Sequence, residues 1–152
     1  MTSKFQNYKQ GYFHPLHLEK YKGTTPIIYR SSLELKFLRW CDSASHVINW
    51  TSESYVVPYL NPFDGKIHRY FIDNSITLKD KNGVNHSFLV EIKPKRKTLA
   101  PTESRKKSTA TILHEKTEWV KNQSKWRSAE QFATKKGMRF IILTEEDLSK
   151  LS

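Results

Sequence analysis

The chain has 152 residues, enough for one domain with its own hydrophobic core. Lys and Arg number 26 against 15 Asp and Glu, which gives a formal net charge of +11 and favours a polyanionic partner, either nucleic acid or an anionic membrane. No apolar run approaches the roughly 20 residues that span a bilayer, so we expect no membrane partner. The only cysteine, Cys41, rules out an intramolecular disulfide and a thiolate zinc site, and it is expected to be buried.

The N-terminal part of the chain is predicted to be a lead-in to one domain. Residues 1–28 are aromatic and basic without clear periodicity, and we expect them to form an arm or an irregular segment ahead of a domain over residues 29–152. A helix is then predicted from Ser31, a typical N-cap, to about Cys41 or Asp42. Apolar side chains recur within it at helical spacing, at Leu33, Phe37 and Trp40.

Strand-forming residues dominate the middle of the chain. Turn residues separate these stretches at 61–66 and 80–83, and the second turn contains Asn-Gly, a strong hairpin signal. The pattern predicts strands over residues 46–50, 54–60, 67–73 and 87–93, with residues 76–79 continuing or following the third of these. Together they form an antiparallel meander of three to four strands.

The C-terminal third changes to a helical period. We expect one helix over about 102–122 and a second from an N-cap at Ser124 to Lys136, ended by Gly137. Residues 138–143 (MRFIIL) predict a central strand, and Thr144 caps a short helix with an acidic first turn. The predicted fold class is α/β, a mixed β-sheet flanked by helices.

The residues best suited to chemistry are Glu91, Lys93 and Asp73. In a strand, residues i and i+2 point to the same face, so Glu91 and Lys93 project together and Ile92 faces the opposite layer. Asp73 ends the strand before the Asn-Gly turn, and that turn is expected to bring it back beside Glu91. The alternative is that Asp73 is a strand-end turn residue and that Glu91 and Lys93 form a solvated face.

Two carboxylates beside an ammonium suit metal-assisted phosphoryl chemistry. Mg²⁺ prefers one or two carboxylates together with water and phosphate oxygens, and a nearby Lys can hold the scissile phosphate. We expect Mg²⁺ as the cofactor, with Mn²⁺ as the alternative ion. The basic run Lys95, Arg96 and Lys97 would extend a positive field along a DNA backbone.

Three ordered segments resemble the PD-(D/E)xK nuclease superfamily: residues 29–34 (YRSSLE), 69–73 (RYFID) and 91–95 (EIKPK). Within it, the chain is most similar to the head completion nucleases of tailed bacteriophages and to the TnsA-like endonuclease subunit of a cut-and-paste transposase. The likeness extends from about residue 21 to 148. It implies a restriction-endonuclease-like core, although Ile72 stands where the superfamily name has Pro.

The resemblance also implies roles for single residues. Asp73 and Glu91 match the metal-binding acids, Lys93 matches the catalytic lysine, and Glu34 matches an acid that the superfamily often carries on its first helix. Glu34 has a second interpretation, because Ser31-x-x-Glu34 is also a capping box in which the Glu side chain bonds back to the N-cap amide. The sequence leaves these two interpretations open.

These observations predict a Mg²⁺-dependent endonuclease that acts on double-stranded DNA. The resemblance implies a phage head completion protein that trims or seals packaged DNA before tail joining, located in the virion and the host cytoplasm, with portal or neck proteins as further partners. The alternatives are a non-catalytic basic head or neck protein and an endonuclease of a transposition or restriction system. Basic residues of the C-terminal helices, Lys125 and Arg127 among them, are candidates to track phosphates, whereas Trp119 and Trp126 are expected to be core residues.

Overall fold

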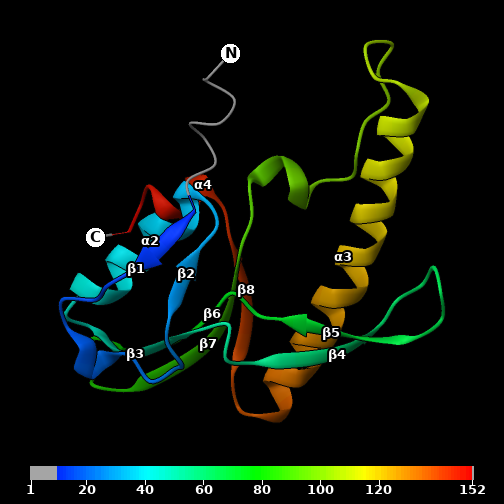
Figure 1. Ribbon diagram of the computed structural model, residues 1–152. Coiled ribbons are helices and arrows are strands. Elements are labelled where there is room, and N and C mark those ends of the chain that lie inside the picture. The colour runs from blue at the N-terminus through cyan, green and yellow to red at the C-terminus, as the bar shows by residue number, and fades with distance from the viewer. Residues whose placement is uncertain (1–9, 152) are drawn as a thin grey trace.

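The computed structural model describes residues 10–151 and has a mixed four-stranded sheet at its centre (Figure 1). The strand order is β3-β6-β7-β8, with antiparallel pairing of β3 with β6 and of β6 with β7, and parallel pairing of β7 with β8. Helices cover both faces of this sheet, so the predicted α/β class is confirmed. The strands are β3 (Val47–Ser52), β6 (Asn74–Lys79), β7 (Asn85–Ile92) and β8 (Arg139–Leu143).

Helix α2 (Ser32–Ser43) covers one face of the sheet. Its first turn is capped as predicted, because the Ser31 side chain accepts a hydrogen bond from the Glu34 amide. Phe37, Leu38 and Cys41 are buried in one cluster with residues of β7, which confirms the buried state of the cysteine. The short helix α4 (Glu145–Leu148) adds Leu148 to this cluster and begins with a complete capping box at Thr144.

The segment ahead of α2 packs against the domain. Strand β1 (Gly11–Phe13) pairs with β2 (Ile27–Tyr29), and the one-turn helix η1 (Leu18–Lys20) lies between them in the chain. Tyr21 and Ile27 are buried in the α2 cluster. The division at residue 28 stays a prediction, and residues 1–9 of the predicted arm lie outside the described part of the chain.

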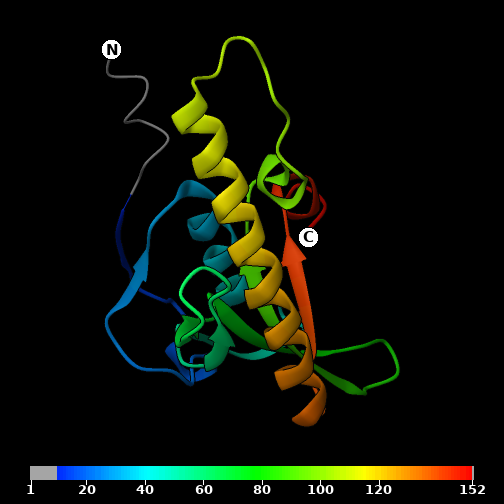
Figure 2. The same cartoon turned by 90° about the vertical axis from the view of Figure 1, so that its right-hand side faces the viewer.

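A single helix, α3 (Thr109–Lys135), replaces the two helices predicted from the sequence. The predicted break at Ser124 was wrong because residues 109–135 contain neither Gly nor Pro. The Ser124 hydroxyl is used elsewhere, since it donates to the carbonyl of Leu60 at 2.6 Å. The helix begins after a cap at Ser108 and ends before Gly137, whose φ of 70° fits the predicted C′ role. Figure 2 shows α3 crossing in front of the sheet.

Strands β4 (Val56–Leu60) and β5 (Ile67–Phe71) form a separate hairpin that packs against α3 (Figure 1). The predicted meander is therefore divided, because β5 ends at Phe71 and the chain passes through Ile72 and Asp73 into the main sheet as β6. The inner face of the hairpin and the C-terminal half of α3 form a second core cluster, built around Val57, Tyr59, Tyr70, Ile72, Leu89, Trp126, Ala129 and Ala133.

Strand β8 lies at an edge of the sheet, and its predicted central position was wrong. The sequence of β8 is apolar although the strand lies at the edge, because its half-buried side chains pack in both core clusters, one on each face of the sheet. Among the helices of residues 10–151, none has the length and apolar character needed to span a bilayer.

Candidate active site

Asp73 and Glu91 are brought together by the register of the β6–β7 hairpin. Asn74 pairs with Val90, so Asp73, one residue before β6, lies level with Glu91 on the neighbouring strand. The turn that closes this hairpin includes Gly83 with a φ of 79°. The predicted return of Asp73 to the side of Glu91 is therefore confirmed.

Glu91 is a buried carboxylate with two differently placed oxygens. Its side chain lies between the sheet and α3 and is 8% exposed. Oε1 accepts a 2.6 Å hydrogen bond from the Tyr70 hydroxyl, while Oε2 lies 3.6 Å from Nζ of Lys93. Glu91 and Lys93 thus project to one side, as predicted, while Ile92 packs in the α2 cluster on the other.

The Asp73 carboxylate is fixed by the backbone of β7. The carboxylate Oδ2 accepts a hydrogen bond from the Ile92 amide at 2.8 Å. The backbone carbonyl of Asp73 accepts a second hydrogen bond, from the Glu53 amide at 3.0 Å. Burial raises the pKa of Asp73 well above its usual value, and the negative charges of Glu91 and Glu34 raise it further. The ionised form of Asp73 is therefore disfavoured in the protein alone.

Glu34 approaches this site from the first turn of α2. Its Oε1 accepts from the Arg30 amide at 3.2 Å and its Oε2 from the Ser31 hydroxyl at 3.3 Å. The backbone partner of the Glu34 side chain is thus the amide of Arg30 and not that of the N-cap residue Ser31, so the capping-box interpretation is met only in part. Burial raises the pKa of Glu34 as well.

An ion pair stands beside these acids. Arg30 Nη1 lies 2.8 Å from Glu53 Oε2, and Glu53 has a left-handed backbone with a φ of 50°. The pKa of Glu34 is raised by burial, and the hydrogen bonds from Arg30 and Ser31 and the Arg30 charge offset only part of that rise. The pKa of Arg30 is raised chiefly by Glu53. Sequence reasoning gave this pair no role, because its partners are 23 residues apart in the chain.

The structure thus brings Asp73, Glu91 and Lys93 together, with Glu34 near enough to act on Asp73 through its charge. Across residues 10–151, no group of three or more His, Cys, Asp or Glu side chains stands as a preformed metal-binding cluster. The donors at hand are carboxylate oxygens, which suit Mg²⁺, an ion that commonly takes only one or two protein carboxylates.

Two further residues at the site were not recognised from the sequence. Tyr70, which holds Glu91, appears in the sequence only as one aromatic residue of a strand. Lys125 lies on α3 with its ammonium 5.5 Å from the centre of the Tyr70 ring and 5.6 Å from that of Tyr59. Burial, followed by the charges of Lys93 and Lys121, lowers the pKa of Lys125. The sequence marked Lys125 only as one of many basic helix residues.

The basic run after β7 divides between two environments. It forms the short helix η2 (Lys95–Thr98). Lys95 Nζ pairs with Glu146 of α4 at 2.8 Å, whereas Arg96 and Lys97 join Lys93 along a cleft in front of α3.

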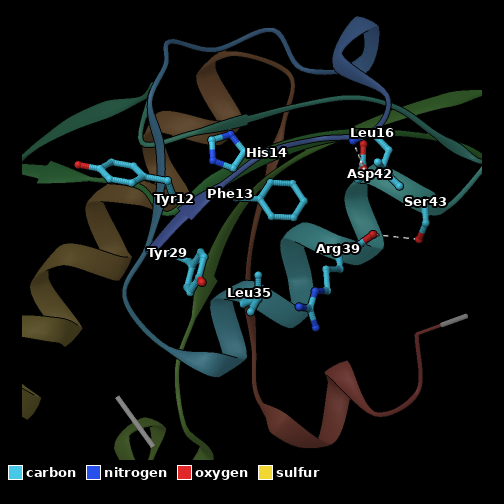
Figure 3. A pocket seen from close by; sticks show the side chains of 9 residues that line it. All are labelled: Tyr12, Phe13, His14, Leu16, Tyr29, Leu35, Arg39, Asp42 and Ser43. Carbon is cyan, nitrogen blue, oxygen red and sulfur yellow. Dashed lines mark hydrogen bonds between the residues drawn. The ribbon is translucent and has the colours of Figure 1, made fainter. Parts of the chain in front are cut away.

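A separate cavity of about 510 Å³ lies between the β1–β2 segment and α2 (Figure 3). Its lining includes Tyr12, Tyr29 and Arg39, and none of the four predicted site residues. The predicted site and this cavity are therefore distinct.

The site and the fold define a class of protein. A mixed sheet flanked by helices positions two acids and a lysine at the end of a central strand, and residues 44–145 match the TnsA-like endonuclease N-terminal family. The chain belongs to this family of endonucleases.

A particular relative covers nearly the whole chain. The head completion nuclease of Enterobacteria phage T4 is 39% identical over 141 residues, which span 90% of this chain and 91% of the relative. Both families named from the sequence are thus confirmed as relatives. No solved structure matches the chain significantly.

Proposed function

We propose that the chain is a Mg²⁺-dependent DNA endonuclease with Glu34, Asp73 and Glu91 as metal ligands and Lys93 as the catalytic lysine. The observation that carries the proposal is the placement of the Asp73 and Glu91 carboxylates beside the Lys93 ammonium. The raised pKa of Asp73 supports it, because a divalent cation would offset the repulsion between these acids. Mn²⁺ is proposed as a second ion that the site accepts.

The residues of the chain have separate tasks in this proposal. Asp73 and Glu91 present fixed oxygens, one held by the Ile92 amide and the other by Tyr70. Lys93 binds a non-bridging oxygen of the scissile phosphate and stabilises the charge that develops there. When bound, the metal supplies an oriented, activated water and neutralises charge on the phosphate.

Substrate binding is proposed to use the positive surface near Lys93. Arg96 and Lys97 line the same cleft as Lys93, and Lys125 lies close enough for the charge of Lys93 to act on it. Contacts of this kind with phosphates carry no sequence information, so they support binding to double-stranded DNA in general.

The biological setting is proposed from the T4 relative. Because the two chains match over nearly their whole lengths, we propose that this protein acts on packaged DNA at head completion, before tail joining. It would then be located in the virion and in the host cytoplasm, with portal or neck proteins as partners. The family match favours a second candidate, an endonuclease of a transposition system, in which the same site performs the same chemistry.

The test is cleavage of supercoiled plasmid by the purified protein in Mg²⁺ and in EDTA. We expect relaxed or linear products in Mg²⁺ only, with loss of cleavage in Asp73→Ala and Glu91→Ala. Glu130→Ala, at an exposed position of α3, is the matched acidic control and should cleave normally. Equal activity in all variants, or none in the wild type, would contradict the proposal and favour a non-catalytic head or neck protein.

A further inference from the structure

A cleft of about 480 Å³ begins at Lys93 and continues between the segment after β7 and the N-terminal half of α3. Of the four proposed catalytic residues only Lys93 lines it. The cleft is thus continuous with the proposed active site, yet most of its walls come from residues without an assigned role.

One end of the cleft is strongly cationic. Lys93, Arg96 and Lys97 all line it, and the pKa of Lys97 is lowered first by burial and then by the charges of Lys93 and Arg96. Cations that destabilise one another in the free protein are stabilised by an anion placed between them. Lys107, further along, is already paired with Glu115 at 2.8 Å.

The other walls suit a flat ring. Leu99 and Pro101 line the cleft together with Trp119, which is half-buried and belongs to neither core cluster. Asn122 also lines the cleft, and its side-chain amide has no hydrogen bond within residues 10–151 and is not among the side-chain groups that are cut off from solvent there. An amide that touches solvent and bonds to no protein group is available to water or to a ligand.

The apolar and polar walls of the cleft, together with its charge, indicate a more specific ligand than its charge alone does. A phosphate would occupy the cationic end but leave the apolar wall and the Asn122 amide uncovered. A nucleotide carries its anion and a flat ring with polar edges in one unit, and bases stack on aromatic side chains with little regard to sequence. A volume of this size lies within the range of sites for small organic ligands.

We propose that the cleft is a subsite for one unpaired nucleotide of the bound strand, next to the scissile phosphate. In a duplex that nucleotide is at an end or is turned out of the base stack. The phosphate of that nucleotide lies at Arg96 and Lys97, and its base lies against Trp119 within reach of Asn122. The proposal rests on the proposed nuclease function for its substrate, but its binding step needs no metal.

The test compares two probes in EDTA: a ten-residue oligothymidylate, and a ten-residue phosphodiester of the same charge that lacks bases. Fluorescence anisotropy should show the full-length protein binding the oligothymidylate about tenfold more tightly, a typical contribution of one stacked base. Trp119→Leu should reduce this difference to less than about twofold. Lys97→Ala should weaken both probes equally. Phe132→Leu, which alters a half-buried aromatic of α3 outside the cleft, should leave the difference unchanged.

Photo-crosslinking locates the base. Thymidine replaced by 5-iododeoxyuridine should crosslink to Trp119, identified by mass spectrometry of the digested protein. Crosslinks only at other aromatic residues, or a base preference that survives in Trp119→Leu, would overturn the subsite. If the wild type cleaves plasmid but shows no base preference, the subsite fails and the nuclease proposal stands. If the wild type does not cleave plasmid but the wild type and Asp73→Asn both prefer the probe with bases, the nuclease proposal fails and the subsite stands.

Discussion

The hydroxyl of Tyr70 donates a 2.6 Å hydrogen bond to Oε1 of Glu91 across the junction between the β4–β5 hairpin and the main sheet. Tyr70 lies in the hairpin and Glu91 in the central strand β7, so the hairpin fixes an acid of the main sheet. Oε2 of Glu91 is left on the side of Lys93. Burial and the Glu91 charge raise the pKa of Tyr70, so this hydroxyl remains a donor over the whole working range of pH.

Removal of this hydroxyl should impair turnover more than substrate binding. In Tyr70→Phe we expect kcat to fall about tenfold, because a hydrogen bond to a charged group contributes about 1.5–3 kcal/mol and here orients a ligand. The Mg²⁺ concentration for half-maximal cleavage should rise, with KM for DNA nearly unchanged. Tyr59→Phe is the matched control, since Tyr59 packs beside Tyr70 without a hydrogen bond to Glu91. Equal kinetics of the two variants would contradict the positioning role.

Asp73→Asn should make the metal-free protein more stable. The folded-state pKa of Asp73 is raised, so its ionised form costs folding free energy at neutral pH, and an uncharged amide oxygen can still accept from Ile92. If the substitution raises the free energy of unfolding by roughly 1 kcal/mol, the Tm in EDTA should increase by about 2–4 °C. Mg²⁺ should then raise the Tm of the wild type but not that of the variant. A lower Tm in EDTA would show that the charge is balanced within the fold.

The two interpretations of Glu34 can be separated by two substitutions. Glu34→Gln keeps an amide oxygen that can accept from the Arg30 amide, and its NH2 group can donate to the Ser31 hydroxyl oxygen, so a pure capping role predicts full activity. We expect instead that Glu34→Gln loses most Mg²⁺-dependent cleavage at nearly unchanged Tm. Ser31→Ala should lose about 1 kcal/mol of folding free energy, the usual cost of an N-cap, while cleavage is retained at permissive temperature. Calorimetry and plasmid cleavage on the same preparations measure both.

Lys125 and Arg127 provide a matched pair of cations on α3. Lys125 is half-buried over two tyrosine rings beside the site, whereas Arg127, two residues further along, is exposed on nearly the opposite side of the helix. Lys125→Met should weaken DNA binding and reduce the slope of log affinity against log salt by about one, the effect of one lost phosphate contact. Arg127→Met should leave the slope unchanged. If the two variants behave alike, the position of Lys125 has no specific role in substrate binding.

Much of the local structure could be predicted because it depends on neighbouring residues. The Ser31 cap, the turn at Gly83 and the end of α3 at Gly137 each follow from the conformational preferences of one or two residues. The adjacency of Asp73 and Glu91 was predictable for the same reason, since a short hairpin fixes register between its two strands.

The errors concern relations between distant segments. Ser124 was predicted as a cap because its hydroxyl suits one, but in the fold that hydroxyl bonds to Leu60, 64 residues away. The apolar run of β8 was predicted to be central, yet an edge strand is equally apolar when both core clusters reach it. Periodicity does not distinguish these cases, because it reports burial and not the neighbour that causes it.

The amino-acid sequence by itself determined the α/β class, the basic charge, and the side-by-side placement of Asp73, Glu91 and Lys93, all of which follow from composition, strand alternation and one tight hairpin. Only the tertiary structure decided that Tyr70 anchors Glu91, that Lys125 lies over the tyrosines, and that Trp119 lines a cleft beside Lys93. Those contacts join segments far apart in the chain, and their geometry is set by how α3 packs on the hairpin and the sheet, which no local pattern encodes.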